Sequence, residues 1–395
     1  MKANPGGTVT GAGILGRESE ISEIWRKIEQ QSVVLTAERR VGKTSVLRKM
    51  YESPQNGWLP ILCWVEKVRH PIECVETIFG DLKNLNALTR KGEWHARTLS
   101  LLGKLSGAEA GGWKLPPVLA NWKQMLETVI EDVAENTGNR VLIMLDEFPL
   151  MIANIMDAQG PGLAMEFLDT LRAIRQRFEP SGKVRFILSG SIGLHLIVQD
   201  LKANHNYRNN PTNDMAALTI SGMCEGDVCL MCKKYLEEES IRRDDIAAFD
   251  QRMLNLTDGL PLWIQYVCER FQAEKRKLVT ADDIDLTLRQ MMDNPEVQWF
   301  DDAAKRIETY YSRLGVNKHA ALILKMLSNE QGFVSERKVI DFLRSQITVE
   351  MDDTVVDVLK LLRDDHYLKR NTESGERCYC FRYRLMREWW KVNRG

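Results

Sequence analysis

Short apolar runs recur through the first 220 residues, separated by amphipathic stretches. Most of the runs are continuous rather than alternating, which favours strands buried on both faces of a parallel sheet. The stretches between them follow a helical spacing, as at Ile21, Ile24 and Ile28. The runs are Val33–Leu35, Gly57–Val65, Val141–Leu145, Val184–Leu188 and Ala217–Ile220. The pattern therefore predicts an α/β fold with a five-stranded, mainly parallel sheet.

Helical spacing marks the connections and then takes over the second half of the chain. Residues 83–121 are less regular, with a loop predicted at Gly107–Pro117. A further helix is predicted after Gly259-Leu260-Pro261, because a proline favours the first position of a helix. The other predicted helices are Pro71–Leu82, Trp122–Asn136, Leu163–Phe178, Gly226–Glu239 and Ile246–Leu256.

Residues 300–395 follow the order of a winged-helix domain. Three helices are predicted at Lys318–Leu327, Ser335–Leu343 and Asp352–Leu362, the second capped by Ser335. Alternating strands, Tyr367–Arg370 and Arg377–Tyr383, then flank a glycine-containing turn. A last helix with two tryptophans closes the chain.

A phosphate-binding loop is predicted between the first strand and the helix that follows it. The segment reads Ala-Glu-Arg-Arg-Val-Gly-Lys-Thr-Ser. Backbone N–H groups and the helix N-terminus would cradle phosphates, Lys43 would neutralise them, and the Thr44 hydroxyl would bind Mg²⁺. The first glycine of the usual motif is replaced by Ala37, so that position has to do without glycine's freedom in φ. The candidate nucleotide-binding residues are Ala37, Glu38, Arg39, Arg40, Val41, Gly42, Lys43, Thr44 and Ser45. A lysine-containing helix start after an ordinary strand is the alternative.

Two adjacent carboxylates follow the third strand. Asp146 and Glu147 come directly after Val141–Leu145, where an open α/β sheet places the groups that handle its ligand. Asp146, with Thr44, would hold Mg²⁺, and Glu147 would orient the attacking water. An exposed Asp-Glu turn after a core strand is the alternative.

The composition of the chain limits the kinds of molecule that we expect it to bind. The formal net charge of −1 gives no global basic field that would attract nucleic acid or an anionic membrane. Among the eight cysteines only Cys229 and Cys232 have C-x-x-C spacing, with no second pair, which disfavours a cysteine metal site and favours a reducing compartment. Residues 1–13 lack the apolar core of a signal peptide, and no run reaches the length of a membrane span. We therefore expect a cytoplasmic protein without membrane contact.

Three motifs together carry a resemblance to a known family. They are Leu15–Glu20 (Leu-Gly-Arg-Glu-Ser-Glu), the loop from Arg39 to Ser45, and Leu145–Phe148 (Leu-Asp-Glu-Phe). The combination resembles the STAND-type P-loop ATPases, in particular their archaeal-type branch, over nearly the whole chain. The resemblance implies an AAA+-like ATPase domain, a helical lid and a C-terminal winged helix, with ATP or ADP as cofactor. We place these domains at residues 1–225, 226–299 and 300–395.

The same resemblance implies roles for residues outside the loop. Gly16 and Arg17 would line the adenine side of the pocket. Pro261 would lie near the nucleotide base, and Ser191 or Ser189 would sense the γ-phosphate or the attacking water. From residue types alone, the first pair also fits a charged helix start, Pro261 a helix-starting proline, and the serines an N-cap.

We predict an ATP-binding, ATP-hydrolysing molecular switch. Its nucleotide state would reposition the lid and winged helix and so control a protein partner or self-association. Catalysis would use Lys43, Glu147 and Ser191, and Arg208 is a candidate for stabilising transition-state charge. A solvated loop arginine is an equal interpretation of Arg208. Binding of nucleotide without hydrolysis is a further alternative.

A DNA-associated ATPase is the leading alternative, since initiator and transposition ATPases also join a P-loop module to a winged helix. The third helix of the predicted winged helix is acidic, with Asp352, Asp353 and Asp357, and Asp364 and Asp365 follow. These carboxylates would face phosphates and weaken binding. The wing carries Lys369, Arg370, Arg377, Arg382 and Arg384, so contact through the wing stays open. The charge pattern favours a protein contact over DNA.

Overall fold

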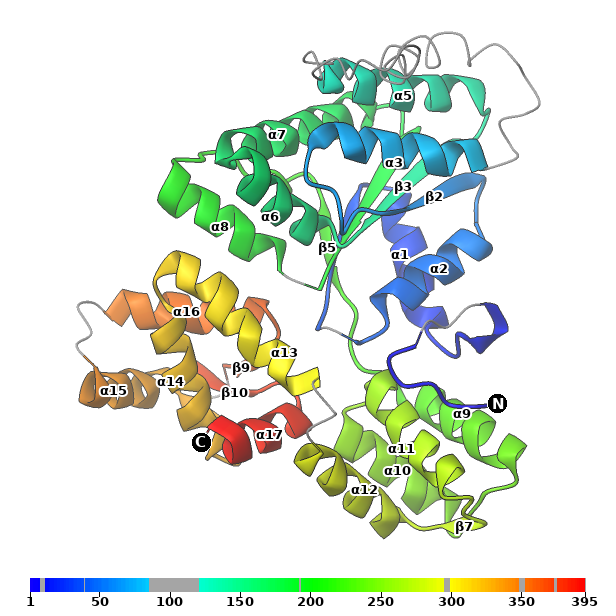
Figure 1. Ribbon diagram of the computed structural model, residues 1–395, viewed down its shortest axis with the longest axis vertical. Helices are drawn as coiled ribbons and strands as arrows, with labels where there is room; N and C mark the ends of the chain where they lie inside the picture. Colours follow the sequence, from blue (N-terminus) through cyan, green and yellow to red (C-terminus); the bar gives the residue numbers. More distant parts are fainter. Residues whose placement is uncertain are drawn as a thin grey trace, which may run out of the picture. The chain divides into compact units, whose positions relative to one another are not determined.

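A parallel sheet lies at the centre of the first half of the chain (Figure 1). The computed structural model describes residues 1–7, 11–38, 40–84, 121–191, 193–294, 299–347, 352–372 and 375–394. The strands of this sheet are β1 (Val33–Thr36), β2 (Trp58–Trp64), β3 (Arg140–Asp146), β4 (Val184–Ser189) and β5 (Ala216–Thr219). Their order is β2-β3-β4-β1-β5, and every neighbouring pair is parallel. The prediction of a five-stranded, mainly parallel sheet is confirmed.

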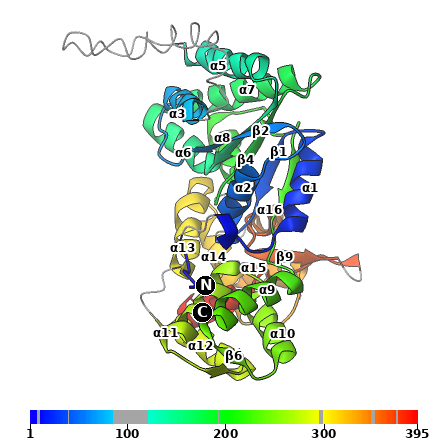
Figure 2. The ribbon, with the colours of Figure 1, turned by 90° about the vertical axis from the view of Figure 1, so that its right-hand side faces the viewer.

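Helices cover both faces of the sheet, which explains why its strands are continuous apolar runs. All six residues of β4 are buried, and Figure 2 shows α1 on one side of the sheet and α3 on the other. The helices of this region are α1 (Glu18–Ile28), α2 (Lys43–Glu52), α3 (Pro71–Asn84), α5 (Trp122–Asn136), α6 (Phe148–Gln159), α7 (Pro161–Phe178) and α8 (Leu194–His205).

Helix α6 was not predicted from the sequence, and its burial explains why. From Phe148 to Met156 every residue is buried except Leu150 and Asn154, which are half-buried. A helix without a polar face has no amphipathic spacing, so its sequence lacks the periodic signal that predicts an exposed helix.

The strand order brings three carboxyl ends to one edge of the sheet. Strand β4 lies between β3 and β1, so that Leu35 pairs with Ser189 and Leu145 pairs with Leu188. The edge therefore receives the segments that follow β1, β3 and β4. Ligand-handling groups gather at this edge in open α/β sheets.

The chain divides into two compact units. The sheet unit comprises Glu18–Thr36 and Lys43–Thr219, and the C-terminal unit comprises Met1–Arg17, Ala37–Gly42 and Ile220–Gly395. Two of the junctions lie at either end of the segment Ala37–Gly42, within the predicted phosphate-binding loop. The division into residues 1–225, 226–299 and 300–395 stays a prediction about the order of functional parts.

The C-terminal unit begins with helices and ends with a small antiparallel sheet. The first group is α9 (Glu225–Leu236, extended by a 3-10 turn at Glu237–Glu239), β6 (Arg242–Arg243), α10 (Ile246–Thr257), α11 (Pro261–Ala273), β7 (Leu278–Val279) and α12 (Ala281–Asp293). The second group is α13 (Trp299–Arg306), α14 (Asn317–Ser328), β8 (Val334–Ser335), α15 (Glu336–Gln346), α16 (Asp352–Asp364), β9 (Leu368–Asn371), β10 (Cys378–Phe381) and α17 (Arg384–Arg394). Strand β10 lies between β8 and β9 and is antiparallel to both. Ser335 caps α15, as predicted, by accepting a hydrogen bond from the Lys338 N–H at 3.3 Å.

An aromatic cluster joins the two groups of elements. Phe300 of α13 stacks on Trp389 of α17 with ring centroids 5.6 Å apart. Trp263 of α11 packs against Phe300 at 5.7 Å and meets Tyr383 edge-on at 6.2 Å. Aromatic pairs of this kind add to the free energy of burial, so helices α11, α13 and α17 share one core.

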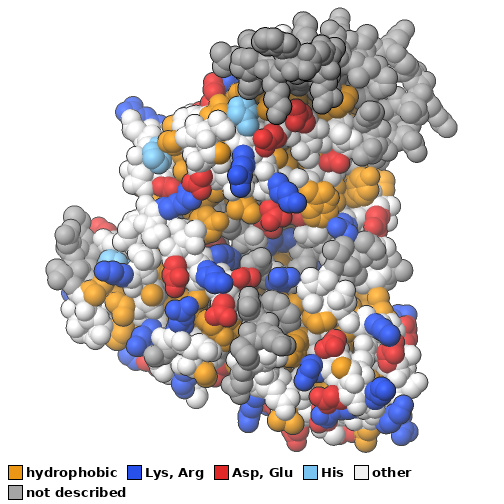
Figure 3. All heavy atoms as spheres, viewed as in Figure 1, with side chains coloured by type: hydrophobic (Ala, Val, Ile, Leu, Met, Phe, Trp, Pro, Cys, Tyr) orange, Lys and Arg blue, Asp and Glu red, His pale blue; other side chains and the backbone are white. Residues whose placement is uncertain are grey.

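Charges of both signs are mixed on the surface. On the face shown in Figure 3, Lys and Arg side chains alternate with Asp and Glu side chains, and no large area carries a single sign. Among the helices of the described residues, none has the length and apolar character needed to cross a bilayer.

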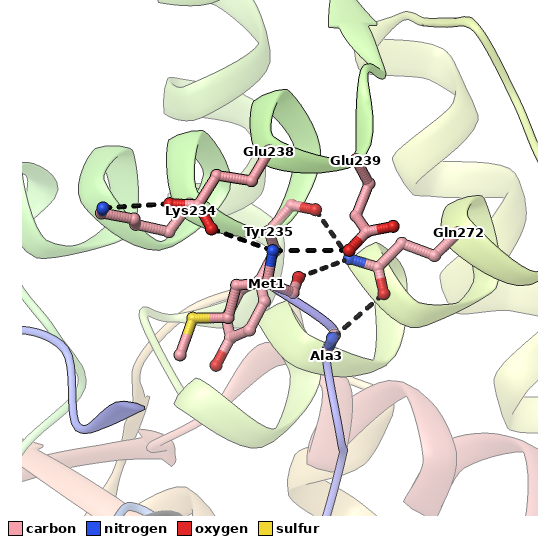
Figure 4. A network of polar contacts seen from close by, with 7 residues as sticks. All are labelled: Met1, Ala3, Lys234, Tyr235, Glu238, Glu239 and Gln272. Atoms are coloured by element: carbon pink, nitrogen blue, oxygen red, sulfur yellow. Dashed lines mark hydrogen bonds and ion pairs between the residues drawn. The ribbon is translucent and has the colours of Figure 1, made fainter. Parts of the chain in front are cut away.

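The first residues of the chain are bound to helices of the C-terminal unit (Figure 4). The Ala3 N–H donates to Gln272 Oε1 at 3.0 Å. Gln272 Nε2 in turn donates to the carbonyl oxygens of Met1 at 3.1 Å and Tyr235 at 2.6 Å. One glutamine of α11 thus holds both the N-terminal segment and the end of α9.

Gly259 is required where the chain enters α11, and its replacement gives a stability test. Its φ is +67°, and an added Cβ would lie 2.3 Å from the carbonyl oxygen of Met223. We expect Gly259→Ala to lower the free energy of unfolding by about 2 kcal/mol or more, through strain and a backbone clash. Urea or thermal unfolding followed by tryptophan fluorescence measures the change.

Gly226→Ala is the matched control. Gly226 lies in α9, where an added Cβ meets nothing within 4 Å, and alanine is the better helix former. We expect this variant to be as stable as the wild type or slightly more so. Equal losses in both variants would contradict the role given to Gly259.

Candidate functional site

Thr44 and Asp146 lie in contact at the carboxyl edge of the sheet. The Thr44 hydroxyl donates to Asp146 Oδ2 at 2.7 Å. Asp146 is the last residue of β3 and is 1 % exposed. Thr44 is the second residue of α2, the helix that follows the loop. The structure thus brings together the two residues predicted to hold Mg²⁺.

The buried position of Asp146 makes its charge costly. Burial raises the pKa of its carboxyl group, while the hydrogen bond from Thr44 and the charge of Lys43 oppose this shift. Lys43 begins α2 and is itself 6 % exposed. A buried carboxylate with a raised pKa is stabilised by a nearby cation, so the site is suited to bind one.

Glu147 and Ser191 form the second contact of the edge. Glu147 Oε2 accepts hydrogen bonds from the Ser191 N–H at 2.9 Å and the Ser191 hydroxyl at 2.8 Å. Glu147 has a φ of +61°, which is uncommon for a residue with a long side chain. Such backbone strain is found where the surrounding structure fixes a side chain for function. Ser189, the alternative to Ser191, is buried at the end of β4.

The loop makes its left-handed turns at Arg40 and Gly42. Their φ angles are +68° and +98°, whereas Ala37 does not have a positive φ. Alanine in place of the first glycine of the motif is therefore compatible with the backbone at position 37. Val41 is fully buried and Ser45 is half-buried. Arg39, also predicted to bind nucleotide, lies outside the described residues.

Arg17 supports the loop from within the C-terminal unit. It is 2 % exposed, and its guanidinium donates to the carbonyl oxygens of Val41 at 2.8 Å and Ser221 at 2.7 Å. Its backbone N–H donates to Asp227 Oδ2 at 3.2 Å. Gly16 precedes it with a φ of +68°, and an added Cβ would lie 2.5 Å from the Asp227 carboxylate carbon. The predicted role of Gly16 and Arg17 on the adenine side stays a prediction.

Pro261 is the first residue of α11. Its neighbours Leu260 and Leu262 line a small cavity together with Glu38 and Arg40 of the loop. The residues on either side of Pro261 thus share one cavity with the loop inside the C-terminal unit. Its predicted contact with a nucleotide base stays a prediction.

Glu38 is held by a residue that sequence reasoning missed. Glu38 is 4 % exposed, and its Oε1 accepts a hydrogen bond from Arg306 Nη2 at 2.6 Å. Arg306 ends α13, 268 residues further along the chain. No local motif surrounds Arg306, so nothing in the sequence signals this pairing.

Arg208 is not brought to the carboxylates. It lies in the loop after α8 and is exposed. Among the described residues it forms no hydrogen bond or ion pair, whereas its neighbour Tyr207 is buried and donates to Asp169 at 2.8 Å. Its predicted role in catalysis stays a prediction.

Comparison with known proteins shows which fold the chain shares. Residues 26–198 match the family model of an AAA domain. A Walker-type ATPase of Pyrococcus abyssi has a TM-score of 0.61 at 14 % identity, with 98 % of each chain covered. The ORC2 protein of Aeropyrum pernix, solved in ADPNP and ADP complexes, has a TM-score of 0.50 at 12 % identity, covering 95 % of this chain and 92 % of that one. The chain has the fold of P-loop ATPases of the AAA+ type.

The two structural likenesses concern the fold alone, because both identities are low. A search of curated proteins found no match. The AAA match includes β1 and β3, the strands that precede the loop and the Asp-Glu pair. The carboxyl edge of the sheet is therefore the candidate active site.

Because the pKa of Asp146 is raised, we expect the effect of Asp146→Asn on the stability of the protein to depend on pH. A carboxyl group with a raised pKa binds its proton more tightly in the folded chain than in the unfolded chain. The stability gained from this proton binding is therefore lost as the pH rises through the pKa of Asp146 in the folded chain. We expect nucleotide-free Asp146→Asn to be at least as stable as wild type at about pH 7.5, with the advantage shrinking toward about pH 4.

Thermal unfolding of both proteins across this pH range checks the sign. The comparison at the acid end of the range is the control, because the protonated Asp146 of the wild type and the asparagine of the variant are then both uncharged. A loss of stability that is largest at neutral pH would contradict the prediction.

Proposed function

We propose that this protein hydrolyses ATP and acts as a nucleotide-dependent molecular switch. The observation that supports this most is the pair of contacts at the carboxyl edge. Thr44 meets Asp146 there, and Glu147 meets Ser191. A metal-ligand pair and an oriented carboxylate are the parts that phosphoryl transfer requires beside a phosphate-binding loop.

Each residue has a defined task in this proposal. Lys43 and the loop N–H groups bind the phosphates. The oxygen donors of Thr44 and Asp146, in direct contact, fit Mg²⁺, which prefers hard oxygen ligands. When bound, the ion would neutralise charge that develops on the phosphates. Glu147 orients the attacking water, and the two hydrogen bonds from Ser191 fix the direction of its carboxylate.

Adenine nucleotides are the proposed ligands. The ORC2 protein of Aeropyrum pernix, which shares the fold, was solved with ADPNP and ADP. The motifs at residues 15–20, 37–45 and 145–148 support the same choice. The proposal names ATP as substrate and ADP as product.

The switch part of the proposal follows from the course of the chain. Ala37–Gly42 belong to the C-terminal unit, and Lys43 begins the next segment of the sheet unit. The loop that would bind nucleotide is thus a covalent junction between the two units. A nucleotide that changes this loop can bias the conformation of the C-terminal unit, and hence its contact with a protein partner or a second copy.

Glu147→Gln tests hydrolysis. Glutamine keeps the size of the side chain but cannot accept a proton from water. We expect the rate of phosphate release from ATP with Mg²⁺ to fall about a hundredfold or more. The dissociation constant for ATP should change by less than about threefold, because the carboxylate acts on water rather than on phosphate.

Glu179→Gln is the matched control, since Glu179 is exposed after α7 and far along the chain from the loop. It should release phosphate at the wild-type rate. If wild type binds ATP but releases no phosphate, the protein binds nucleotide without hydrolysis, and the catalytic role of Glu147 has no support.

One observation favours contact with DNA as a second function. The β9–β10 hairpin carries Lys369 and Arg370, both exposed. Of the aspartates expected to face phosphates, Asp365 is instead buried: it is 3 % exposed and accepts a hydrogen bond from the Tyr311 hydroxyl. Asp353 and Asp357 are exposed as expected. Positive charge on the wing and negative charge on the helix oppose each other, so we keep the protein partner as the first choice.

Duplex DNA binding at different salt concentrations separates the two functions. We expect a dissociation constant no tighter than about 10 µM near physiological salt, in the range of non-specific binding. Tight binding whose salt slope falls by about 1 in Arg370→Ala would favour the DNA-associated ATPase instead. Lys391→Ala, an exposed change in α17, is the control for a general loss of positive charge.

A further inference from the structure

The phosphate-binding loop contains a buried ion pair. Glu38 is the second residue of the loop, and its carboxylate accepts a hydrogen bond from Arg306 at 2.6 Å. The two side chains are 5 % and 9 % exposed. Both residues belong to the C-terminal unit. Removing one partner of such a buried ion pair costs much free energy, because the other charge is then left buried without it.

Arg306 is fixed by residues near the end of the chain. Its guanidinium lies over the ring of Tyr367, 5.4 Å from the centroid. The Tyr367 hydroxyl donates to the carbonyl oxygen of Ala303, one turn before Arg306, at 2.7 Å. Burial alone would lower the pKa of Arg306, but Glu38, Tyr367 and Asp365 outweigh it and raise that pKa. Arg306 therefore keeps its positive charge.

Apart from Arg40, the surroundings of the pair are apolar. The cavity beside Glu38 and Arg306 is lined by Trp263, Phe300 and Met386, among others. A low dielectric strengthens the attraction between the two charges, and it also makes either charge costly without the other. The pair therefore holds the loop to α13 more firmly than an exposed ion pair would.

The arginines anchor the loop through its oxygen atoms, whereas a phosphate would bind its N–H groups. Arg306 binds the side chain of Glu38, and Arg17 binds the carbonyl oxygen of Val41. A phosphate is bound by the backbone N–H groups of the loop. The two arginines can thus hold the loop in shape without competing for its N–H groups.

The sign of the charges has a further consequence. A carboxylate within a phosphate-binding loop repels the phosphates. The guanidinium of Arg306 neutralises the Glu38 carboxylate at 2.6 Å and so removes most of this repulsion. Loss of Arg306 would both loosen the loop and remove this neutralising charge from beside the ligand.

We propose that Arg306 is a positioning residue for nucleotide binding, which it controls by holding Glu38 and with it the segment Ala37–Gly42. The inference rests on the proposed function, in which this loop binds nucleotide. It adds that the C-terminal elements that hold Arg306 set the affinity of the loop. A partner that displaces Tyr367 from Arg306 would release nucleotide, and by linkage nucleotide would oppose that partner.

The test compares nucleotide affinity with stability in the full-length protein. Fluorescent ADP with Mg²⁺ is titrated into wild type, Arg306→Met, Glu38→Gln and the double variant, and each is also unfolded thermally without nucleotide. We expect Arg306→Met to weaken ADP binding at least about tenfold. The double variant should bind more tightly than the product of the two single effects predicts, because it contains neither charge.

Arg243→Met is the matched control. Arg243 pairs with Asp250 at 2.5 Å in the same unit, and their side chains are 2 % and 7 % exposed. This variant should lose thermal stability, as Arg306→Met does, but bind ADP within about twofold of wild type. If Arg306→Met does not fold, Arg306→Lys and Tyr367→Leu replace it. Lysine should recover part of the affinity, and the change at Tyr367 should weaken binding without altering the loop sequence.

The outcomes are distinct. Wild-type affinity in Arg306→Met, or the same affinity loss in Arg243→Met, would overturn the inference and leave the proposed function in place. An additive double variant would also overturn it, since the pair would then not act as one unit. A wild-type protein that binds no ADP or ATP would overturn the proposed function, and the inference with it.

Discussion

A sheet buried on both faces can carry charged groups only where its strands end. Strand β3 shows this constraint directly, because five apolar residues separate Arg140 at one end from Asp146 at the other. Asp146 is nevertheless buried, and its raised pKa records the cost. The hydroxyl of Thr44 offsets part of this cost, and a bound cation would offset more. The candidate active site lies at this edge because the packing of the sheet leaves few places for charged groups elsewhere.

Two arginines outside the motif bind oxygen atoms of the loop and add positive charge beside it. Arg17 and Arg306 both reach the segment Ala37–Gly42, one through the Val41 carbonyl and the other through the Glu38 carboxylate. A loop that must bind anions gains from positive charge around it, but it also needs its own N–H groups to remain available. Guanidinium groups bound to oxygen atoms of the loop satisfy both demands.

Different observations support the fold and the proposed function. The AAA match over residues 26–198 and the two structural likenesses show the fold that the chain shares with P-loop ATPases of the AAA+ type, and they concern the architecture alone. Function depends on particular side chains, which a shared fold does not specify. For that reason the contacts of Glu147 with Ser191 and of Thr44 with Asp146 carry the proposed activity. The shared aromatic core of α11, α13 and α17 bears on the proposed role of Arg306, because these helices pack together around it.

The sequence by itself determined the sheet, the loop and the carboxylate pair, because each depends on short-range patterns. Buried strands are apolar runs, and Gly42-Lys43-Thr44 is a local motif. It did not reveal α6, whose buried surface leaves no periodic signal, nor that Ala37 needs no positive φ. Only the tertiary structure decided which residues meet across long separations. Ser191 reaches Glu147 across 44 residues, and Arg306 reaches Glu38 across 268. Such pairings follow from the packing of whole elements, and no local pattern of residues encodes them.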